Sequence, residues 1–544
     1  MKTVVPALWR KGFWLQLVLA AAAAPLSGQV PLGWAYRAPL GEDMKPGPWI
    51  GAGLWSAAKG GPIAPLEESL GYGNALTGSG VEIEGGWKRG GWDLAAQVMG
   101  YRDTDGLTHA SLFRGHATFR SQGGWRFSLE KEPLVWGYGL NGGYLLGEAS
   151  QPVPKLLLSS PYRAISLFSV PLGSWKGSVF LGKLEGPNIV PETSQLWSYK
   201  TRIFAAGQAP VHPFLSGIRG EARFGDSVEF YMNWINLFGG TIDGRRVDEG
   251  YTLKNYVTVF LGAKDTAAEG GFDFNRPGGV PPQGTPVISA SNSDVGMRIR
   301  LDALAKALSA RNVWVYVSRG SKAVNISYGP FLHQPGVYLG KDLDADWKDI
   351  SYLHIGKIWS RTYRYTAPSP VVPNDGFGIL AEWGAWKWGL EYLDTINTRN
   401  QFGGIGVIGR DVELGHRSFT HAFYQGGFYE EGDPLGSALG GEARYTTLHA
   451  EWRPAPAWQV QGWFQSGDRP FRDVTADWLL DHPGASPVRD HFVQAQGVVS
   501  YQGAGGLRLR LGASVQRHSA VRNVQGDHGT GSRGFIEAGW RWGL

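Results

Sequence analysis

The sequence predicts an all-β protein, a transmembrane antiparallel β-barrel of about 18 strands with a short Pro/Gly-rich N-terminal segment before the barrel. Three observations predict this fold. The chain begins with an export signal, apolar and polar residues alternate over repeated stretches, and long and short connections alternate between those stretches. Together they are typical of proteins that cross the bacterial outer membrane with strands.

Residues 1–28 are typical of a Sec-type signal peptide. Lys2, Arg10 and Lys11 supply a positive start, and residues 13–24 are apolar but too short to cross a bilayer. The chain contains no cysteine, which excludes a lipoprotein anchor. Beyond the signal we find no apolar run of roughly 18 residues, so a membrane location requires strands.

Composition favours a barrel over a set of soluble domains. The chain has 24 Trp, 21 Tyr and 24 Phe, spread singly along alternating segments as in the aromatic girdles of barrels. The absence of cysteine excludes disulfides, thiolate nucleophiles and Cys-ligated metals. The net charge of +5 is small and no Lys/Arg run is present, so nucleic acid is not an expected partner.

Residues 29–79 contain many Pro and Gly residues and show no clear alternation. We therefore expect a segment before the barrel, with the barrel itself formed by residues 80–544. Three alternatives remain for this segment, which could plug the lumen, form a periplasmic cap or be mobile.

Strict alternation over about ten residues is the strand signal of a wall with one face in lipid and one in the lumen. It is clearest in residues 228–234, 295–302 and 507–516. A soluble β-sandwich also alternates, but the connections argue against it. Residues 301–310 have Leu and Ala at helical spacing, so a helical turn and a strand end are equal alternatives. The arginines of the presumed lumen face are Arg298, Arg300, Arg508 and Arg510.

The C-terminal third alternates long and short connections, as the two rims of a barrel do. Around residues 397–415 an inserted loop and an extra hairpin remain alternatives. The chain ends inside an alternating strand, residues 536–544, which resembles the strand recognised by the barrel-assembly machinery, although its last residue is Leu and not the more usual Phe. The connections are, from the C-terminus, 518–532 (long), 502–505 (short), 467–489 (long), 453–455 (short) and 426–441 (long).

Neither a metal site nor an enzyme is expected. Asp342, Asp344 and Asp346 have the spacing of a calcium loop, but Trp347 and Leu353 replace its Gly and Glu, which favours an acidic solvated loop. No Gly-x-Ser-x-Gly elbow appears, and histidines in loops are common. We expect no catalytic residues, metal or cofactor.

The most distinctive stretch is residues 131–160, KEPLVWGYGLNGGYLLGEASQPVPKLLLSS. A basic residue and Pro precede Trp-Gly-x-Gly, followed by Gly, an aliphatic pair, a small residue, Pro-x-Pro and an apolar strand. This ordered stretch resembles the capsule-assembly Wzi family, and weaker matches extend the resemblance over most of the chain. It departs before the barrel, where the family often has short helices. The matching residues are Trp136, Gly137, Gly139, Gly142, Gly143, Leu145, Leu146, Ala149, Pro152 and Pro154.

The resemblance implies an outer-membrane lectin that holds capsular or extracellular polysaccharide at the cell surface. The other expected partners are outer-membrane lipid, lipopolysaccharide and, during biogenesis, the barrel-assembly machinery. We expect the chain to be a monomer. Sugar rings stack on aromatic side chains, and acidic sugars pair with Arg. The alternative is a porin-like channel for polar or charged solutes, in which the lumen arginines would line water instead of pairing with Asp or Glu. The candidate ligand-binding residues are Trp136, Tyr138, Tyr144, Tyr429, Arg469, Phe471, Arg472 and Trp478.

Overall fold

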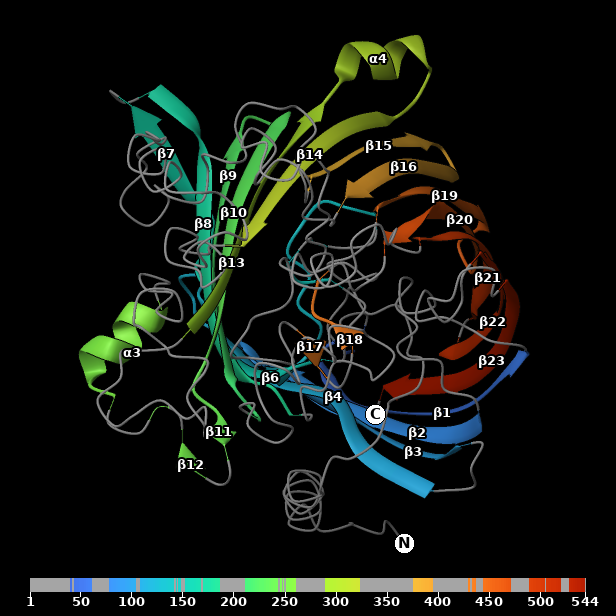
Figure 1. Cartoon of the computed structure of the whole chain (residues 1–544), viewed down its shortest axis with the longest axis horizontal. Helices are drawn as coiled ribbons and strands as arrows, with labels where there is room; N and C mark the ends of the chain where they lie inside the picture. The colour runs from blue at the N-terminus through green and yellow to red at the C-terminus, as the bar shows by residue number, and fades with distance from the viewer. Residues whose placement is uncertain are drawn as a thin grey trace, which may run out of the picture.

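The computed structural model describes the wall of the molecule and several of its connections (Figure 1). The described residues are 40–41, 44–60, 78–103, 108–140, 143, 145–147, 152–167, 170–185, 211–242, 245–246, 248, 251–260, 289–322, 375–394, 429–430, 433–436, 444–470, 489–503, 505–519 and 528–543. The predicted signal peptide lies outside them.

The described strands form one large antiparallel sheet and two small hairpins, β11–β12 and β17–β18. Their bounds are β1 (Gly47–Gly60), β2 (Gly78–Arg89), β3 (Trp92–Asp103), β4 (Thr108–Arg120), β5 (Arg126–Lys131), β6 (Pro154–Ser159), β7 (Arg163–Leu167), β8 (Val170–Lys183), β9 (Phe214–Phe224), β10 (Val228–Phe238), β11 (Thr241–Ile242), β12 (Arg245–Arg246), β13 (Ser289–Arg300), β14 (Asn312–Lys322), β15 (Asp375–Trp383), β16 (Trp386–Asp394), β17 (Tyr429–Glu430), β18 (Asp433–Pro434), β19 (Arg444–Ala455), β20 (Trp458–Pro470), β21 (Arg489–Gln502), β22 (Leu507–His518) and β23 (Gly529–Gly543).

The large sheet closes on itself. β1 pairs with β2 along one edge and with β23 along the other, so the first and last strands of the wall are neighbours. β6 and β7 pair one after the other along β8 and therefore share one place in the ring. The described strands thus form an 18-strand closed antiparallel barrel, which confirms the predicted fold class.

The strand β1 corrects the expected domain boundary, because it lies within residues 29–79 and is part of the wall. Its inward positions are occupied by glycine, tryptophan and alanine, so the strand lacks the apolar and polar alternation of its neighbours. The glycines leave room for charged side chains of β2. A Cβ on Gly51 would lie 2.6 Å from Glu84 Oε1, and one on Gly53 would lie 2.5 Å from Glu82 Oε1.

The long and short connections lie at opposite ends of the barrel, as predicted. The short turns, such as 90–91, 384–385 and 456–457, lie at the end where β23 finishes, which we call the periplasmic rim. The strand ends that the long connections join lie at the other end, the outer rim. Residues 397–415, where the sequence pattern failed, lie outside the described residues.

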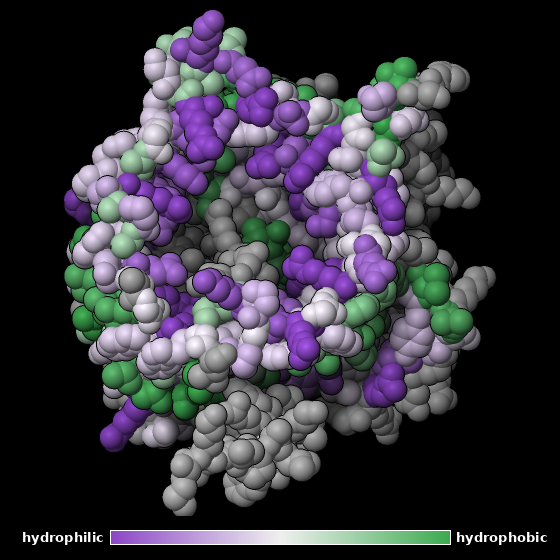
Figure 2. All heavy atoms as spheres, turned by 180° about the vertical axis from the view of Figure 1, so that it is seen from behind, coloured by the Kyte–Doolittle hydropathy of each residue, from purple (hydrophilic) through white to green (hydrophobic). Residues whose placement is uncertain are grey.

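The two faces of the wall differ in polarity. On β22, Leu509 and Leu511 are exposed on the outside, whereas Arg508 and Gln516 are buried inside. Apolar side chains that are exposed in the isolated chain are the ones that lipid covers. In Figure 2, hydrophobic residues gather on the flanks of the barrel and hydrophilic ones surround the end that faces the viewer. An aromatic girdle near the periplasmic rim includes Trp386 and Trp452, whose stacked rings are 5.3 Å apart.

Two short helices accompany the described strands. α3 (Leu253–Phe260) follows the β11–β12 hairpin, and α4 (Asp302–Ala307) joins β13 to β14. α4 confirms the helical alternative for residues 301–310. No helix in the described part of the chain is long and apolar enough to span a membrane.

Because the outer face of the wall contacts lipid, an arginine on that face should lower the free energy of unfolding most near the centre of the bilayer. We expect Leu511→Arg, on the exposed outer face of β22, to lower the free energy of unfolding by about 2–4 kcal/mol, because a charge near the bilayer centre is poorly solvated. Leu507→Arg, on the same face but at the periplasmic rim, is the control and should cost about 0–1 kcal/mol. Denaturant unfolding in lipid vesicles measures both, and equal losses would contradict this orientation of the wall.

Candidate functional site

A stretch between β5 and β6 leaves the wall and enters the barrel. We call it the lumen segment, residues 132–147. Its Gly-rich sequence lacks the alternation of a strand, and in Figure 1 its trace runs from the side of β4 and β6 toward β14–β16. In the order of the ring, β5 and β16 are separated by β6, β8, β9, β10, β13, β14 and β15, so they lie on nearly opposite sides.

Trp136 fixes the first part of the lumen segment. Its ring is 3% exposed and meets Phe180 of β8 edge-on, with centroids 5.2 Å apart. Its N–H donates to Leu146 O at 2.9 Å, and its carbonyl accepts from Asn233 Nδ2 of β10 at 3.1 Å. A Cβ on Gly143 would lie 2.0 Å from Trp136 O, so only glycine fits there. Trp136 therefore packs this turn against the wall.

Leu140 carries the segment to the opposite wall. Its N–H donates to Glu391 Oε2 of β16 at 2.8 Å, and Tyr316 Oη of β14 donates to the same oxygen at 2.6 Å. The Leu140 side chain lies over Gly389, where an added Cβ would be 2.5 Å from Leu140 Cδ2. The N–H of Gly147 donates to Leu435 O, next to the β17–β18 hairpin, at 2.7 Å. The segment thus reaches β16, which lies nearly opposite the strand β5 from which the segment starts.

Tyr138 lies between these two anchors and contacts aromatic and basic side chains of the wall. Its ring centroid is 4.9 Å from that of Tyr231, and Arg298 Cζ is 4.7 Å from the Tyr138 ring. Burial, with the nearby Glu229 charge, raises the pKa of Tyr138 to about 12. Tyr138 therefore stays neutral at physiological pH and presents its ring face to a cation.

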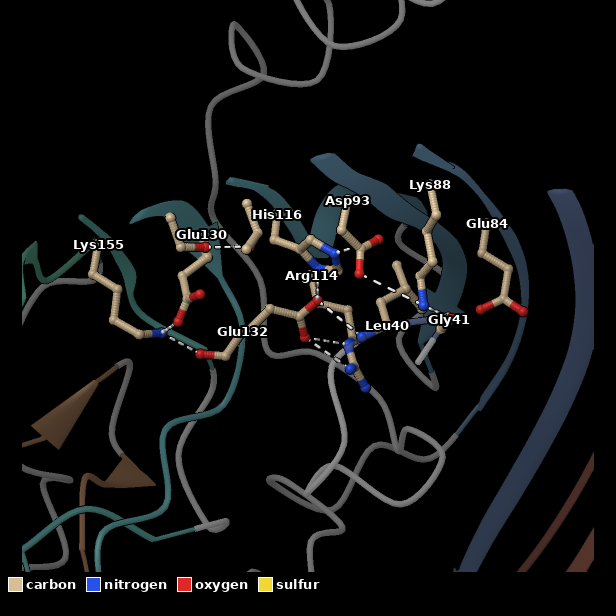
Figure 3. A network of polar contacts seen from close by, with 12 residues as sticks. Leu40, Gly41, Glu84, Lys88, Asp93, Arg114, His116, Glu130, Glu132 and Lys155 are labelled. Carbon is tan, nitrogen blue, oxygen red and sulfur yellow. Dashed lines mark hydrogen bonds and ion pairs between the residues drawn. The ribbon is translucent and has the colours of Figure 1, made fainter. Parts of the chain in front are cut away.

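The base of the lumen segment is held by the carboxylate of Glu132, which is almost fully buried (Figure 3). Arg114 Nη2 lies 2.7 Å from Glu132 Oε2, and His116 Nδ1 lies 2.8 Å from Oε1. The N–H of Leu40, before β1, donates to Oε1 at 3.1 Å. On the other side of His116, its Nε2 lies 3.2 Å from Asp93 Oδ1. One carboxylate thereby joins β4, the lumen segment and the chain before β1.

Further charges extend this cluster along the wall. Lys155 of β6 donates to the backbone oxygen of Glu132, and its Nζ lies 3.4 Å from Glu130 Oε1. Lys88 of β2 donates to Gly41 O at 2.6 Å. Buried charges are stable only when paired and hydrogen-bonded, so this arrangement requires all of its members. We call it the Glu132 network, and its members are Leu40, Gly41, Lys88, Asp93, Arg114, His116, Glu130, Glu132 and Lys155.

The four arginines predicted to face the lumen all have carboxylate partners. Arg298 lies 2.7 Å from Glu229, and Arg300 lies 2.7 Å from Asp302. On the other side of the ring, Arg508 pairs with Glu84 at 2.6 Å and Arg510 with Glu537 at 3.2 Å. Such pairing is expected of a closed lumen, whereas in a channel these arginines would line water.

The candidate ligand-binding residues do not gather in one described place. Trp136 and Tyr138 lie inside the barrel, where Trp136 is too buried to stack on a sugar. Tyr429 belongs to β17, and Arg469 lies at the outer end of β20, opposite Asp490 of β21. The others lie outside the described residues, namely Tyr144, Phe471, Arg472 and Trp478. No group of three or more His, Asp or Glu side chains placed to hold a metal occurs in the described part of the chain.

Sequence reasoning missed the Glu132 network. Glu132 stands in the distinctive 131–160 stretch, but its partners Arg114 and His116 are 18 and 16 residues away, and Leu40 is 92 residues away. The available signal was the pair Arg114 and His116, two charged or titratable residues at alternate positions in the middle of β4.

The network predicts that Glu132→Gln loosens the lumen segment. The change preserves shape but removes the charge that pairs with Arg114, and breaking a buried pair costs about 3–5 kcal/mol. We expect faster hydrogen exchange at the amides of Leu40, Trp136 and Gly143. The control is Glu382→Gln, whose partner Lys387 is 47% exposed and whose loss should cost about 0–1 kcal/mol. If both variants exchange like the wild type, Glu132 does not hold the segment.

Comparisons with known proteins identify solved structures with a similar fold. No family model matches the chain, and no curated protein matches its sequence. Among solved structures, Wzi of Escherichia coli, an outer-membrane protein involved in group 1 capsule assembly and described as a carbohydrate-binding β-barrel, has a TM-score of 0.54 and 13% identity. The match covers 98% of this chain and 89% of that one.

Two outer-membrane proteins of Pseudomonas aeruginosa are less similar. OpdQ has a TM-score of 0.41 and 8% identity, over 91% of this chain and 97% of that one. OprD has a TM-score of 0.39 and 8% identity, over 91% and 94%. Both scores are too low to carry an argument. The closed barrel with its apolar exterior and the match to Wzi agree, and this protein is an outer-membrane β-barrel similar in fold to Wzi.

Proposed function

We propose that this barrel binds a capsular or related extracellular polysaccharide at its outer rim and helps to attach it to the cell surface, without catalysis. The observation that carries the proposal is the lumen segment, which is bonded to β4 through Glu132 and, nearly opposite in the ring, to β16 through Leu140. A barrel whose interior is crossed in this way is better suited to holding a ligand outside than to passing a solute.

The charges of the lumen support the same choice. A channel for charged solutes needs side chains that face water and are free to meet the solute. Here Arg298, Arg508 and Arg510 have carboxylate partners at 2.7, 2.6 and 3.2 Å. The porin-like alternative is therefore less well supported, although both functions use the same barrel.

The chemistry of one long outer connection fits a polysaccharide. Arg469 is the next-to-last residue of β20, and Phe471, Arg472 and Trp478 follow it in the sequence before β21. Aromatic rings stack on the CH faces of sugars, and arginine pairs with the carboxylates of acidic sugars. That Wzi is described as carbohydrate-binding adds to this proposal.

The lumen segment gives a prediction about conductance. We expect the wild-type protein in planar bilayers to show no steady large openings. Replacing residues 134–151 by a short glycine–serine linker should produce them, because β5 and β6 are antiparallel neighbours and the linker can join them without crossing the lumen. Replacing residues 302–309, which include α4 at the periplasmic rim, in the same way is the control and should open nothing. Steady large openings of the wild type would favour the channel.

The outer connection gives a prediction about binding. The triple variant R469A/R472A/W478A, in lipid nanodiscs, should retain polysaccharide purified from the producing strain at least about tenfold less tightly than the wild type. Each charge-assisted hydrogen bond contributes about 1.5–3 kcal/mol, and 1.4 kcal/mol is a factor of ten. Arg120→Ala, at the opposite rim, is the matched control and should bind normally.

Two failures of this experiment have different meanings. If the wild type binds and the triple variant binds equally well, the function stands and the chosen residues are wrong. If the wild type does not retain the polysaccharide, and deletion of the gene does not increase the share of polysaccharide shed from cells, the proposed function is wrong.

A further inference from the structure

α3 lies on the outside of the barrel wall and not over the lumen. Figure 1 shows it outside the ring of strands, beside β10 and β13. Trp234, Asn236 and Phe238 share the outward face of β10 with Phe230 and Met232, because alternate residues of a strand point the same way. Phe230 and Met232 are exposed, but Phe238 is buried and packs near Tyr256 of α3. α3 therefore covers the outer end of this strand.

The part of β10 that α3 covers lies where the apolar, lipid-facing band of the wall ends. Along the register of β10 and β13, Met232 stands opposite Val295, and Trp234 opposite Ser293. Asn236 comes next, with its side chain buried and its Nδ2 within 3.4 Å of Phe260 O at the end of α3. An amide facing hydrocarbon without a partner is costly. α3 thus begins to cover the wall at the level where hydrocarbon gives way to polar surroundings.

The free flank of α3 is apolar. Leu253 and Val257, which lie one turn apart on the same face, are 80% and 49% exposed. They lie on the same outer side of the wall as the exposed Phe230 and Met232, since α3 packs on the outward-facing Phe238 of β10. Because this side of the wall faces lipid, lipid is the occupant that would cover them.

α3 is held in this position by a polar brace. Asp248 is buried, and it accepts hydrogen bonds from Tyr256 Oη at 2.6 Å and from Arg246 Nε at 3.1 Å. Burial raises the pKa of Asp248, but the hydrogen bonds from Arg246 and Tyr256 outweigh it and hold that pKa below its usual value. At the start of the helix, Thr252 Oγ1 accepts from the N–H of Asn255 at 3.3 Å. The brace fixes which flank faces away from the wall.

We propose that α3 is an interfacial helix, which lies in the boundary between headgroups and acyl chains of the outer leaflet and contacts its lipid through Leu253 and Val257. Short amphipathic helices bind membranes in this way, with the apolar face buried about 5–10 Å below the headgroups. The contact anchors one side of the outer rim, next to β9, β10 and β13, to the membrane surface.

The absence of native cysteine allows a direct test with single labelled positions. An environment-sensitive fluorophore is attached to Leu253→Cys, to Met232→Cys on the lipid-facing wall as the deep reference, and to Asp226→Cys in the periplasmic turn as the water reference. The full chain is folded into phosphatidylcholine–phosphatidylglycerol vesicles carrying a spin label either at the headgroup or at the end of the acyl chain. Heat-modifiable migration on gels verifies that each variant is folded.

The expected result is a graded depth. The label at position 253 should be protected from iodide and quenched more by the headgroup spin label than by the acyl-end label, whereas the order reverses at position 232. Iodide quenching at 253 equal to that at 226 would overturn the proposal. Protection from iodide without quenching by either lipid label would also overturn it, because another protein surface, such as a second copy, would then cover the helix.

Discussion

The constraint on which the rest of the structure depends is that backbone N–H and C=O groups find no water inside a bilayer. Each strand must therefore pair on both edges, and only a closed ring leaves none open. β1 closes this ring, paired with β2 from Gly47 to Ala57 and with β23 from Trp49 to Gly60. Without β1, the edges of β2 and β23 would face lipid, so a segment with a weak strand pattern is fixed as a strand by its neighbours.

A closed ring of many strands encloses more space than its own inward side chains can fill. The interior therefore has room for another part of the chain. The lumen segment occupies part of that space, and it brings polar groups into a poorly hydrated interior. Glu132 is stabilised there because Arg114, His116 and the N–H of Leu40 all meet its carboxylate. The packing of Trp136 and the contact of Leu140 with β16 then follow from where Glu132 holds the segment.

These two requirements explain how far the sequence could predict the structure. The alternation in β22 was visible because Leu509 and Leu511 oppose Arg508 and Arg510, whereas β1 was hidden because Gly51 and Gly53 make room for glutamates of another strand. The lumen partners of Glu132 are distant in sequence and no local pattern connects them. Trp136 was predicted as a sugar-stacking residue because an aromatic flanked by glycines is equally suited to exposure and to tight burial, and only the fold decides.

The arginines of the wall and those of the outer connections differ in role. Inside the wall, Arg508 neutralises Glu84, and its loss would leave a buried charge unpaired, while Arg298 neutralises the partly buried Glu229. Closure of the ring makes no such demand on the sequence between β20 and β21, which contains Arg472. Under the proposed function, residues that bind the polysaccharide could therefore vary without loss of the barrel, whereas the paired charges of the lumen could not. The choice of ligand would then reside in the connections at the outer rim, and the lumen charges would serve the wall and the segment that crosses it.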